Sequence, residues 1–216
     1  MAANGGRPAG LGVVGVPASV LGWAELAEAA GAAGLGAEVD LRLDGASFSS
    51  GAHASVVEVD VETGAVRLRR HVAVDDCGTV LNPMVVAGQQ HGGCAAGIGQ
   101  ALFEAVAYDG EGNPRTTTFA DYLLPTAAEL PFFETDTLGI PTHIAPNGAK
   151  GIGENGAVVA PTSVQNAVVD ALSHLGVRHV DLPLTPEAVW AALAAASTAG
   201  DAAAAARRSA QDVRRA

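Results

Sequence analysis

The chain has 216 residues, a formal net charge of −11 and a hydrophobic share of 49%, which suits one large or two small domains with a sizeable core. The acidic charge excludes nucleic acid and anionic membranes as partners, because both require basic patches. No apolar stretch of about 18 residues predicts a membrane span, and no secretory signal is recognisable, so a cytoplasmic protein is expected. Cys77 and Cys94 fit neither a disulfide framework nor a metal spacing. They are predicted to be buried free thiols, and no metal-ligating side chain is predicted.

The N-terminal segment shows no regular pattern over its first 22 residues and then predicts a helix. Leu21, Trp23, Leu26 and Ala29 recur at helical spacing. Gly31 follows at a position where helices commonly end. We therefore expect a short helix in the twenties.

The clearest local pattern is a β-hairpin. The segment "SVVEVDVETGAVRLRRHVAVDD" alternates apolar and polar residues on both sides of "ETGA". A two-residue loop at Thr63-Gly64 gives cross-strand pairs that are apolar on one face and oppositely charged on the other, as cross-strand energetics favour. The predicted pairs are Val61 with Val66, Val59 with Leu68, Asp60 with Arg67, and Glu58 with Arg69.

A glycine-rich helix is predicted from about Val85 to Val106. It contains five glycines, at positions 88, 92, 93, 97 and 99. Each glycine costs about 0.5–1 kcal/mol relative to alanine inside a helix. Close approach of another backbone, close approach of a ligand, or tight packing against a sheet could each compensate.

The second half of the chain is predicted to contain a turn with a short strand at 108–119, a long proline-containing loop and two helices. The first helix is expected to start near Pro161 and end at Gly176, and the last to be capped by Thr185 with Pro186 in its first turn. The first has an apolar face formed by Val164, Val168, Ala171, Leu172 and Leu175. These elements predict an α+β fold, with one domain over 1–195 and an Ala/Arg-rich flexible or frayed tail over 196–216.

The segment "PNGAKGIGENGAVVA" places Glu154 among glycines and leaves three interpretations open: a nucleotide loop, a surface turn, or a carboxylate that meets a bound ligand. "GIGENG" matches the dinucleotide pattern, but no hydrophobic strand precedes it. Pro161 also argues against the helix that the dinucleotide motif should open. No Gly-Lys-Ser/Thr sequence supports a phosphate loop. A carboxylate at a helix start is stabilised by free N–H groups and by the helix dipole, so Glu154 could be held as an ionised base.

Four ordered stretches resemble the C-terminal part of the molybdenum-binding large subunit in the xanthine dehydrogenase, aldehyde oxidase and aerobic carbon monoxide dehydrogenase family. The stretches are "GAHASVVEVDVETGAVRLRRHVAVDDCGTVLNP", "GQQHGGCAAGIGQALFE", "DYLLPTAAELP" and "GAKGIGENG". The resemblance runs from about Val13 to Ala195. It implies a C-terminal molybdopterin-binding domain of α+β class, with a hairpin, a glycine-rich helix and C-terminal helices.

The resemblance assigns roles to particular residues. Glu154 matches the family's general base, which takes a proton from a metal-bound hydroxide that attacks carbon while hydride passes to a sulfido ligand. Gln89 matches a glutamine that hydrogen-bonds the cofactor's oxo group. The implied cofactor-binding residues are Gln89, Gly88, Gly92, Gly93, Lys150, Gly151 and Gly153.

The resemblance further implies molybdenum–molybdopterin, in its cytosine dinucleotide form, and an aldehyde, N-heterocycle or CO as the small-molecule substrate. Iron–sulfur clusters and FAD would belong to partner subunits. The family subunit is several times longer, so the chain resembles a fragment whose partner is the missing N-terminal half, without which it would be inactive. The alternative is a non-catalytic truncated remnant that acts as an interaction domain or has no function alone.

Overall fold

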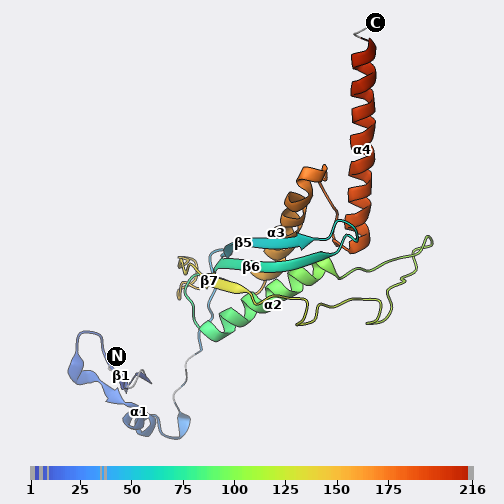
Figure 1. Cartoon of the computed structure of the whole chain (residues 1–216). Coiled ribbons are helices and arrows are strands. Elements are labelled where there is room, and N and C mark those ends of the chain that lie inside the picture. The colour runs from blue at the N-terminus through green and yellow to red at the C-terminus, as the bar shows by residue number, and fades with distance from the viewer. Residues whose placement is uncertain (1–2, 5–6, 9, 35, 37, 214–216) are drawn as a thin grey trace. The chain divides into compact units, whose positions relative to one another are not determined.

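The computed structural model describes residues 3–4, 7–8, 10–34, 36 and 38–213, and they divide into two compact units, Met1–Arg42 and Leu43–Ala216. Figure 1 labels their helices and strands. The last three residues of the predicted tail, 214–216, lie outside the described residues. Each unit is described separately.

The first unit consists of short elements. β1 (Ala3–Asn4) pairs with β2 (Arg7–Pro8), and β3 (Gly10–Leu11) pairs with β4 (Leu21–Gly22). A 3₁₀ turn, η1 (Pro17–Ser19), precedes β4, and α1 (Trp23–Ala30) is followed by η2 (Gly31–Ala33). The predicted helix is confirmed, and Gly31 caps it with a φ of 55°, where a side chain would be strained.

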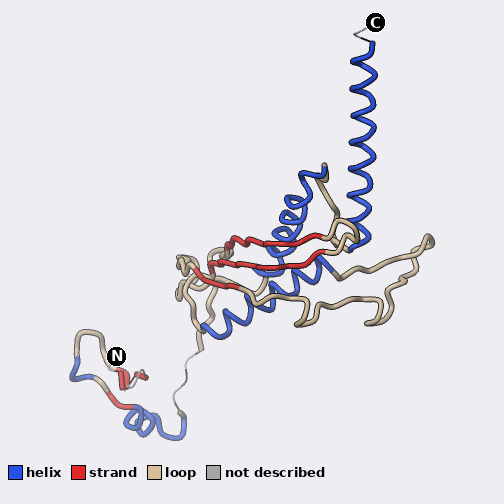
Figure 2. Tube along the Cα trace, in the orientation of Figure 1, coloured by secondary structure: helices blue, strands red, loops and turns tan. Residues whose placement is uncertain are grey.

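The second unit is built on a three-stranded sheet with two helices on one face. The sheet contains β5 (Ser50–Val59), β6 (Val66–Asp76) and β7 (Glu134–Thr137) in the order β5-β6-β7. β5 and β6 are antiparallel, and β7 joins β6 in parallel. α2 (Pro83–Leu102) and α3 (Asn155–Leu172) pack against each other, and α3 crosses behind β5 in the view of Figures 1 and 2. The core lies between this face and the helices, and contains Leu68, Ala73, Ile98, Val164 and Val168 among other buried residues.

The hairpin is confirmed, but its predicted register is wrong by two residues. Val59 pairs with Val66, because residues 61–64 form a longer loop in which the Asp60 carboxylate accepts hydrogen bonds from the backbone N–H groups of Glu62 and Thr63. A shift by two keeps every side chain on its predicted face. Glu58 still forms an ion pair with Arg69, although it lies opposite Arg67.

A β-bulge changes which residues of β6 point inward. The register shifts between Val56 and Val57, so that Arg69 is an additional residue on β6. Before the bulge Leu68 is buried, and after it His71, Ala73 and Asp75 are buried. The bulge therefore turns the side chains of His71 and Asp75 toward the two helices.

The glycine-rich helix is confirmed as α2, although it ends at Leu102 rather than near Val106. Asn82 caps its start by accepting hydrogen bonds from the N–H groups of Met84 and Val85. Close approach of a second backbone compensates for the cost of glycine in this helix. A Cβ on Gly93 would lie 3.0 Å from the Cα of Gly156 on α3. Of the three explanations that the sequence left open, the structure therefore shows the approach of another backbone at Gly93.

Three further expectations about the second half were wrong. Residues 108–119 contain an isolated bridge between Tyr108 and Pro114 instead of a strand, because the segment closes a tight turn around Asp109. α3 begins at Asn155 and contains Pro161, whose ring packs against Gly97. Leu175 is 41% exposed, because the helix gives way to the 3₁₀ turn η3 (Ser173–Leu175). β7 was not predicted.

The last helix starts as predicted and continues into the predicted tail. α4 spans Pro186–Val213, and the hydroxyl of Thr185 accepts a hydrogen bond from the Ala188 N–H at its start. Among the helices that the structure describes, none is long and apolar enough to cross a membrane. Cys77 and Cys94 are free and buried, as expected.

Candidate functional site

The candidate site is a cavity at the start of α3, here called the glycine-loop pocket. It has a volume of about 510 Å³ and is lined by residues 47–51, Gly151, Gly153, Glu154, Asn155, Val158 and Val159. Two segments far apart in sequence therefore form its walls, the loop that leads into β5 with the first residues of that strand, and the loop and first residues of α3. The segment around Glu154 is a wall of a pocket as well as a turn.

Glu154 is the N-cap residue of α3, and its side chain is exposed. Its backbone carbonyl accepts the first helical hydrogen bond, from the Val158 N–H at 3.0 Å. The carboxylate makes no capping hydrogen bond within the described part of the chain. The helix start thus positions the carboxylate beside the pocket while leaving its oxygens available to a bound molecule.

Gln89 approaches the same loop from α2. The side chain is exposed, and a Cβ built on Gly153 would lie 3.3 Å from Gln89 Oε1. Glycine at 153 therefore lets the amide lie against the backbone immediately before Glu154. The structure thus places Gln89 against the residue that precedes Glu154 in the chain, and Glu154 is the other residue to which the resemblance gave a specific role.

The predicted glycines fall into two groups. At Gly88, Gly92 and Gly151, the position that a Cβ would occupy has no described atom within 4 Å apart from the adjacent residues and, on α2, the helix's own backbone. Gly93, by contrast, contacts the backbone of Gly156 on α3. The first group leaves space that an external molecule could use, and Gly93 is used for packing between helices.

Lys150 anchors the loop by an ion pair. Its Nζ lies 2.5 Å from Asp76 Oδ2, and the two side chains are 12% and 3% exposed. The ammonium group and the backbone N–H groups of Gly78 and Ile140, which donate to the same carboxylate, hold the pKa of Asp76 below its ordinary value. The backbone of Lys150 also donates to the carbonyl of Cys77. Its side chain is therefore already engaged within the protein.

A buried carboxylate lies beneath the pocket. Asp75 on β6 is fully buried and accepts hydrogen bonds from Gln90 Nε2 at 2.9 Å and from Asn155 Nδ2 at 3.1 Å. Gln90 also donates to the carbonyl of Asp136 on β7. This network joins β6, β7, α2 and the first residue of α3, so it fixes the position of Glu154 from below.

Asn155 links the network to the other wall of the pocket. It accepts a hydrogen bond from the Ser49 hydroxyl at 2.5 Å and donates to the Ser50 carbonyl at 3.2 Å. The junction between the pocket-lining loop and β5 is thereby tied to the residue after Glu154. Sequence reasoning missed Asp75 and Asn155, and used Gln90 only for the resemblance.

Two titratable groups near this network are perturbed by burial. Burial, reinforced by the neighbouring His53, lowers the pKa of His71 to about 4, although Asp75 acts in the opposite direction. Burial and the negative charge of Asp75 raise the pKa of Cys94 to about 11. At neutral pH both side chains are therefore uncharged.

The comparisons with known proteins identify the family. Residues 9–131 match the sequence profile of the molybdopterin cofactor-binding domain. The chain belongs to the molybdopterin cofactor-binding domain family. Within this family it is 47% identical over 142 residues to the nicotine 6-hydroxylase large subunit of Paenarthrobacter nicotinovorans, which covers 66% of this chain and 17% of the relative.

Other relatives in the family agree. The carbon monoxide dehydrogenase large chain of Hydrogenophaga pseudoflava is 42% identical over 147 residues, covering 68% of this chain and 18% of the relative. The crystal structure of quinoline 2-oxidoreductase from Pseudomonas putida 86 superposes with a TM-score of 0.65 at 45% identity, covering 67% of this chain and 18% of that one. The chain thus spans about a fifth of the length of these relatives.

The membership confirms the predicted resemblance to a molybdopterin-binding large-subunit family and the α+β fold class. The predicted site residues, the C-terminal placement and the division into a domain over 1–195 and a tail stay predictions. The same holds for the cytoplasmic location.

Proposed function

We propose that this chain contributes the cofactor-binding wall and the proton-accepting carboxylate of a molybdenum hydroxylase. The observation that carries the proposal is the position of Glu154, which is exposed at the glycine-loop pocket and directly follows the glycine against which the Gln89 amide lies, in a chain of this family. The substrate class is a small molecule with an electrophilic carbon, namely an aldehyde, an N-heterocycle or CO. The relatives, which include a nicotine hydroxylase and carbon monoxide dehydrogenases, support this range.

Glycines on α2 and in the loop that opens α3 fit a bulky cofactor. Gly88 and Gly92 on α2 and Gly151 in the loop leave open space where other residues would place a Cβ. A cofactor can therefore approach the backbone closely at these positions. When bound, molybdenum–molybdopterin supplies the two-electron oxidation of the carbon centre.

Each side chain then has a role of its own. Gln89 is neutral and both donates and accepts, so it can bind a polar atom of the cofactor without adding charge. Glu154 is proposed to accept the proton at a carboxylate oxygen, which requires approach to about 3 Å. Lys150, Asp76 and Asn155 act as positioning residues, because their contacts hold the loop and the start of α3.

The remaining parts of the enzyme are proposed to come from elsewhere. Because the chain spans about a fifth of its relatives, the rest of the large subunit would complete the cofactor site, with this chain at the C-terminal end. Separate subunits would carry the iron–sulfur clusters and FAD, and the cofactor would be the cytosine dinucleotide form. The "large subunit" and "complex subunit" in relatives' names support assembly from several chains, and we place the complex in the cytoplasm.

A chimera tests the proposal. The matching segment of the nicotine 6-hydroxylase large subunit is replaced by this chain's segment and produced with its partner subunits. We expect the chimera to retain molybdenum and to hydroxylate nicotine at a measurable rate. A chimera that is folded but contains no molybdenum would contradict the cofactor assignment and favour the non-catalytic alternative. If the chimera holds molybdenum and its Glu154→Gln variant hydroxylates nicotine at the same rate as the unaltered chimera, the assignment of the base is contradicted.

A further inference from the structure

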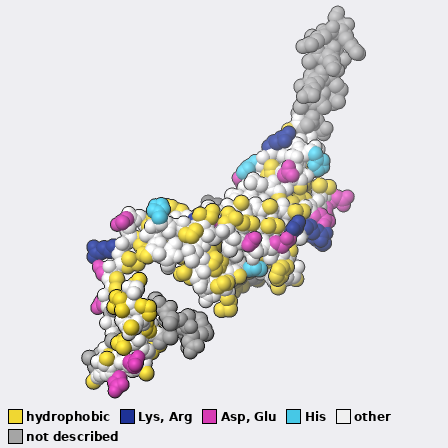
Figure 3. Space-filling model, turned by 90° about the vertical axis from the view of Figure 1, so that its left-hand side faces the viewer, with side chains coloured by type: hydrophobic (Ala, Val, Ile, Leu, Met, Phe, Trp, Pro, Cys, Tyr) yellow, Lys and Arg dark blue, Asp and Glu magenta, His cyan; other side chains and the backbone are white. Residues whose placement is uncertain are grey.

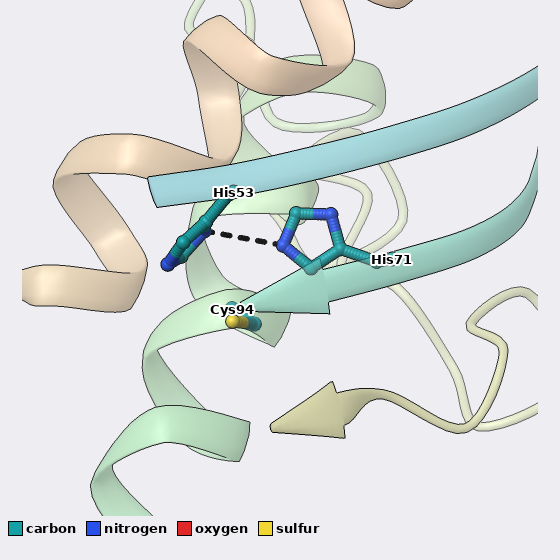
Figure 4. Close-up of side chains that lie close together, drawn as sticks. All are labelled: His53, His71 and Cys94. Carbon is teal, nitrogen blue, oxygen red and sulfur yellow. Dashed lines mark hydrogen bonds between the residues drawn. The ribbon is translucent and has the colours of Figure 1, made fainter. Parts of the chain in front are cut away.

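Beyond the molybdenum function, three buried side chains converge from three elements at one point of the core. His53 lies on β5, His71 on β6 and Cys94 on α2, and Figure 4 shows them facing one another. One donor atom from each lies within 4.8 Å of the other two. The side chains of all three are fully buried. We propose that these residues bind a divalent transition-metal ion, with zinc as the reference ion.

The donor set suits this ion. Two imidazole nitrogens and one thiolate are the ligand types that zinc prefers, and three protein ligands leave a fourth position open. His53 Nδ1 and His71 Nε2 lie 3.2 Å apart. Two nitrogens bound tetrahedrally at about 2.0–2.1 Å from zinc are separated by about 3.3–3.4 Å, so this pair already has the required spacing.

The outer nitrogen of each imidazole has its own partner. His53 Nε2 lies 3.4 Å from Asp75 Oδ1, and His71 Nδ1 lies 2.9 Å from the Ser55 hydroxyl. The Ser55 hydroxyl in turn lies 2.8 Å from that of Ser163 on α3. Metal-bound histidines almost always have such a carboxylate or other polar partner on the nitrogen that faces away from the metal. The surrounding contacts therefore orient both rings for a shared ligand.

Without metal, a single proton shared in a hydrogen bond between His53 Nδ1 and His71 Nε2 gives both nitrogens a partner. Metal binding would replace that hydrogen bond by two nitrogen–metal bonds and move the His71 proton to Nδ1, where Ser55 accepts it. The Cys94 thiol would release its proton to solvent as the sulfur–metal bond forms. The metal-free arrangement leaves no buried side-chain nitrogen or oxygen without a partner among the described residues.

A cavity of about 290 Å³ lies beside the cluster. It is lined by His53, Ser55, Ser163 and Asp170 together with Ala54, Asn166 and Ala167. Asp170 is exposed and carries the charge that attracts a cation to this opening. The cavity differs from the glycine-loop pocket, and Asp75 lies between the two sites because it contacts both His53 and Asn155.

Equilibrium dialysis of the untagged full chain against Zn²⁺ tests the site and tolerates self-association. We expect one zinc per chain. Cys94→Ala should weaken binding more than about 100-fold, and Ser55→Ala, which removes an outer partner, by about 10-fold. Cys77→Ala is the matched control, because Cys77 is also buried and free but lies outside the cluster. It should bind zinc as the unaltered chain does.

A second measurement does not depend on the variants' folding. Co²⁺ replaces Zn²⁺ in the unaltered chain, and thiolate coordination should give a charge-transfer absorption that nitrogen and oxygen ligands do not give. No retained zinc, no such absorption, or equal loss of zinc in Cys77→Ala and Cys94→Ala would each overturn the proposal. Because none of these readouts uses molybdenum or turnover, their outcome is independent of the proposed hydroxylase function.

Discussion

The Oε1 atom of Gln89 lies against the backbone of Gly153, so close that a Cβ at position 153 would be 3.3 Å from it. Gln89 belongs to α2 and Gly153 to the loop that opens α3. This contact places the Gln89 amide against the residue that immediately precedes Glu154. A neutral hydrogen-bonding group and an ionisable one next to each other can bind a ligand and accept its proton separately.

The first prediction concerns Glu154 in the chimeric large subunit. Glu154→Gln keeps the size of the side chain and removes the base. Because general base catalysis typically contributes about 10²–10⁴-fold, we expect hydroxylation to fall at least about 100-fold, mainly in kcat. The molybdenum content should stay near that of the parent chimera. Metal analysis and steady-state rates on the same preparations measure both.

Gln89→Ala is the matched comparison for that experiment. It removes a proposed cofactor contact without removing the base, so molybdenum content should fall together with the rate. If Glu154→Gln turns over at the parent rate, Glu154 is only a turn residue. If Gln89→Ala retains all its molybdenum, the amide does not hold the cofactor.

Local sequence patterns predicted the elements that alternate or repeat. The hairpin followed from apolar alternation around "ETGA", and the faces of Val59 and Leu68 were correct even though the loop was longer. α4 followed from the Thr185 cap. These features depend on neighbours in the chain, and a single sequence contains that information.

Features that depend on distant segments were not predictable. The bulge at Arg69 does not interrupt the alternating pattern that predicts a strand. It nevertheless reverses which side of β6 is buried and turns His71 and Asp75 inward. Asp75 and Asn155 are 80 residues apart, and only packing of α3 on the sheet brings them together. Pro161 was taken as a sign of a helix start, whereas tertiary packing against Gly97 accommodates it within α3.

The second prediction concerns the Asp76–Lys150 ion pair and pH. The pKa of Asp76 is lowered on folding, so its stabilising contribution is complete above the unfolded pKa, near about 4, and is lost as pH falls through the folded pKa. Asp76→Asn should lower the free energy of unfolding by about 3 kcal/mol at pH 7, because it leaves Lys150 buried without its partner. Urea unfolding at several pH values should show this difference shrinking below about pH 4.

Glu134→Gln is the control for the ion-pair prediction. Glu134 pairs with Arg70 on the surface, with side chains 49% and 59% exposed. Such exposed pairs contribute little to stability because solvent and salt screen them, so this variant should be nearly as stable as the parent. Equal effects of the two substitutions at pH 7 would contradict a special role for Asp76.

The third prediction concerns exposed hydrophobic side chains on the second unit. Phe132, Phe119, Phe48 and Met84 are 87%, 85%, 83% and 78% exposed. Figure 3 shows hydrophobic side chains spread over the surface seen in that view. Because large exposed apolar surface promotes association, we expect the chain alone to self-associate in sedimentation velocity. Phe119→Ser with Met84→Ser should reduce the association, and a monodisperse monomer of the parent chain would contradict the prediction.

The last prediction separates glycines that pack from glycines that leave space for a ligand. A Cβ on Gly156 would lie 2.4 Å from the backbone N of Cys94, so Gly156→Ala must push α2 and α3 apart. Such overpacking costs about 1–3 kcal/mol. Gly92 faces open space, and Gly92→Ala should instead raise the free energy of unfolding by about 0.5–1 kcal/mol, because alanine favours the helix. Urea unfolding of the two single variants compares them directly.

In the chimera, the stabilising substitution should have the opposite effect on the cofactor. If molybdopterin approaches α2 at Gly92, the added methyl group occupies part of that space, and Gly92→Ala should lower the molybdenum content although the protein is more stable. Thr162→Ala is a suitable control, since Thr162 is an exposed residue on α3 and outside the pocket lining. A Gly92→Ala chimera that is more stable and retains full molybdenum would mean that the open face of α2 is not used by the cofactor.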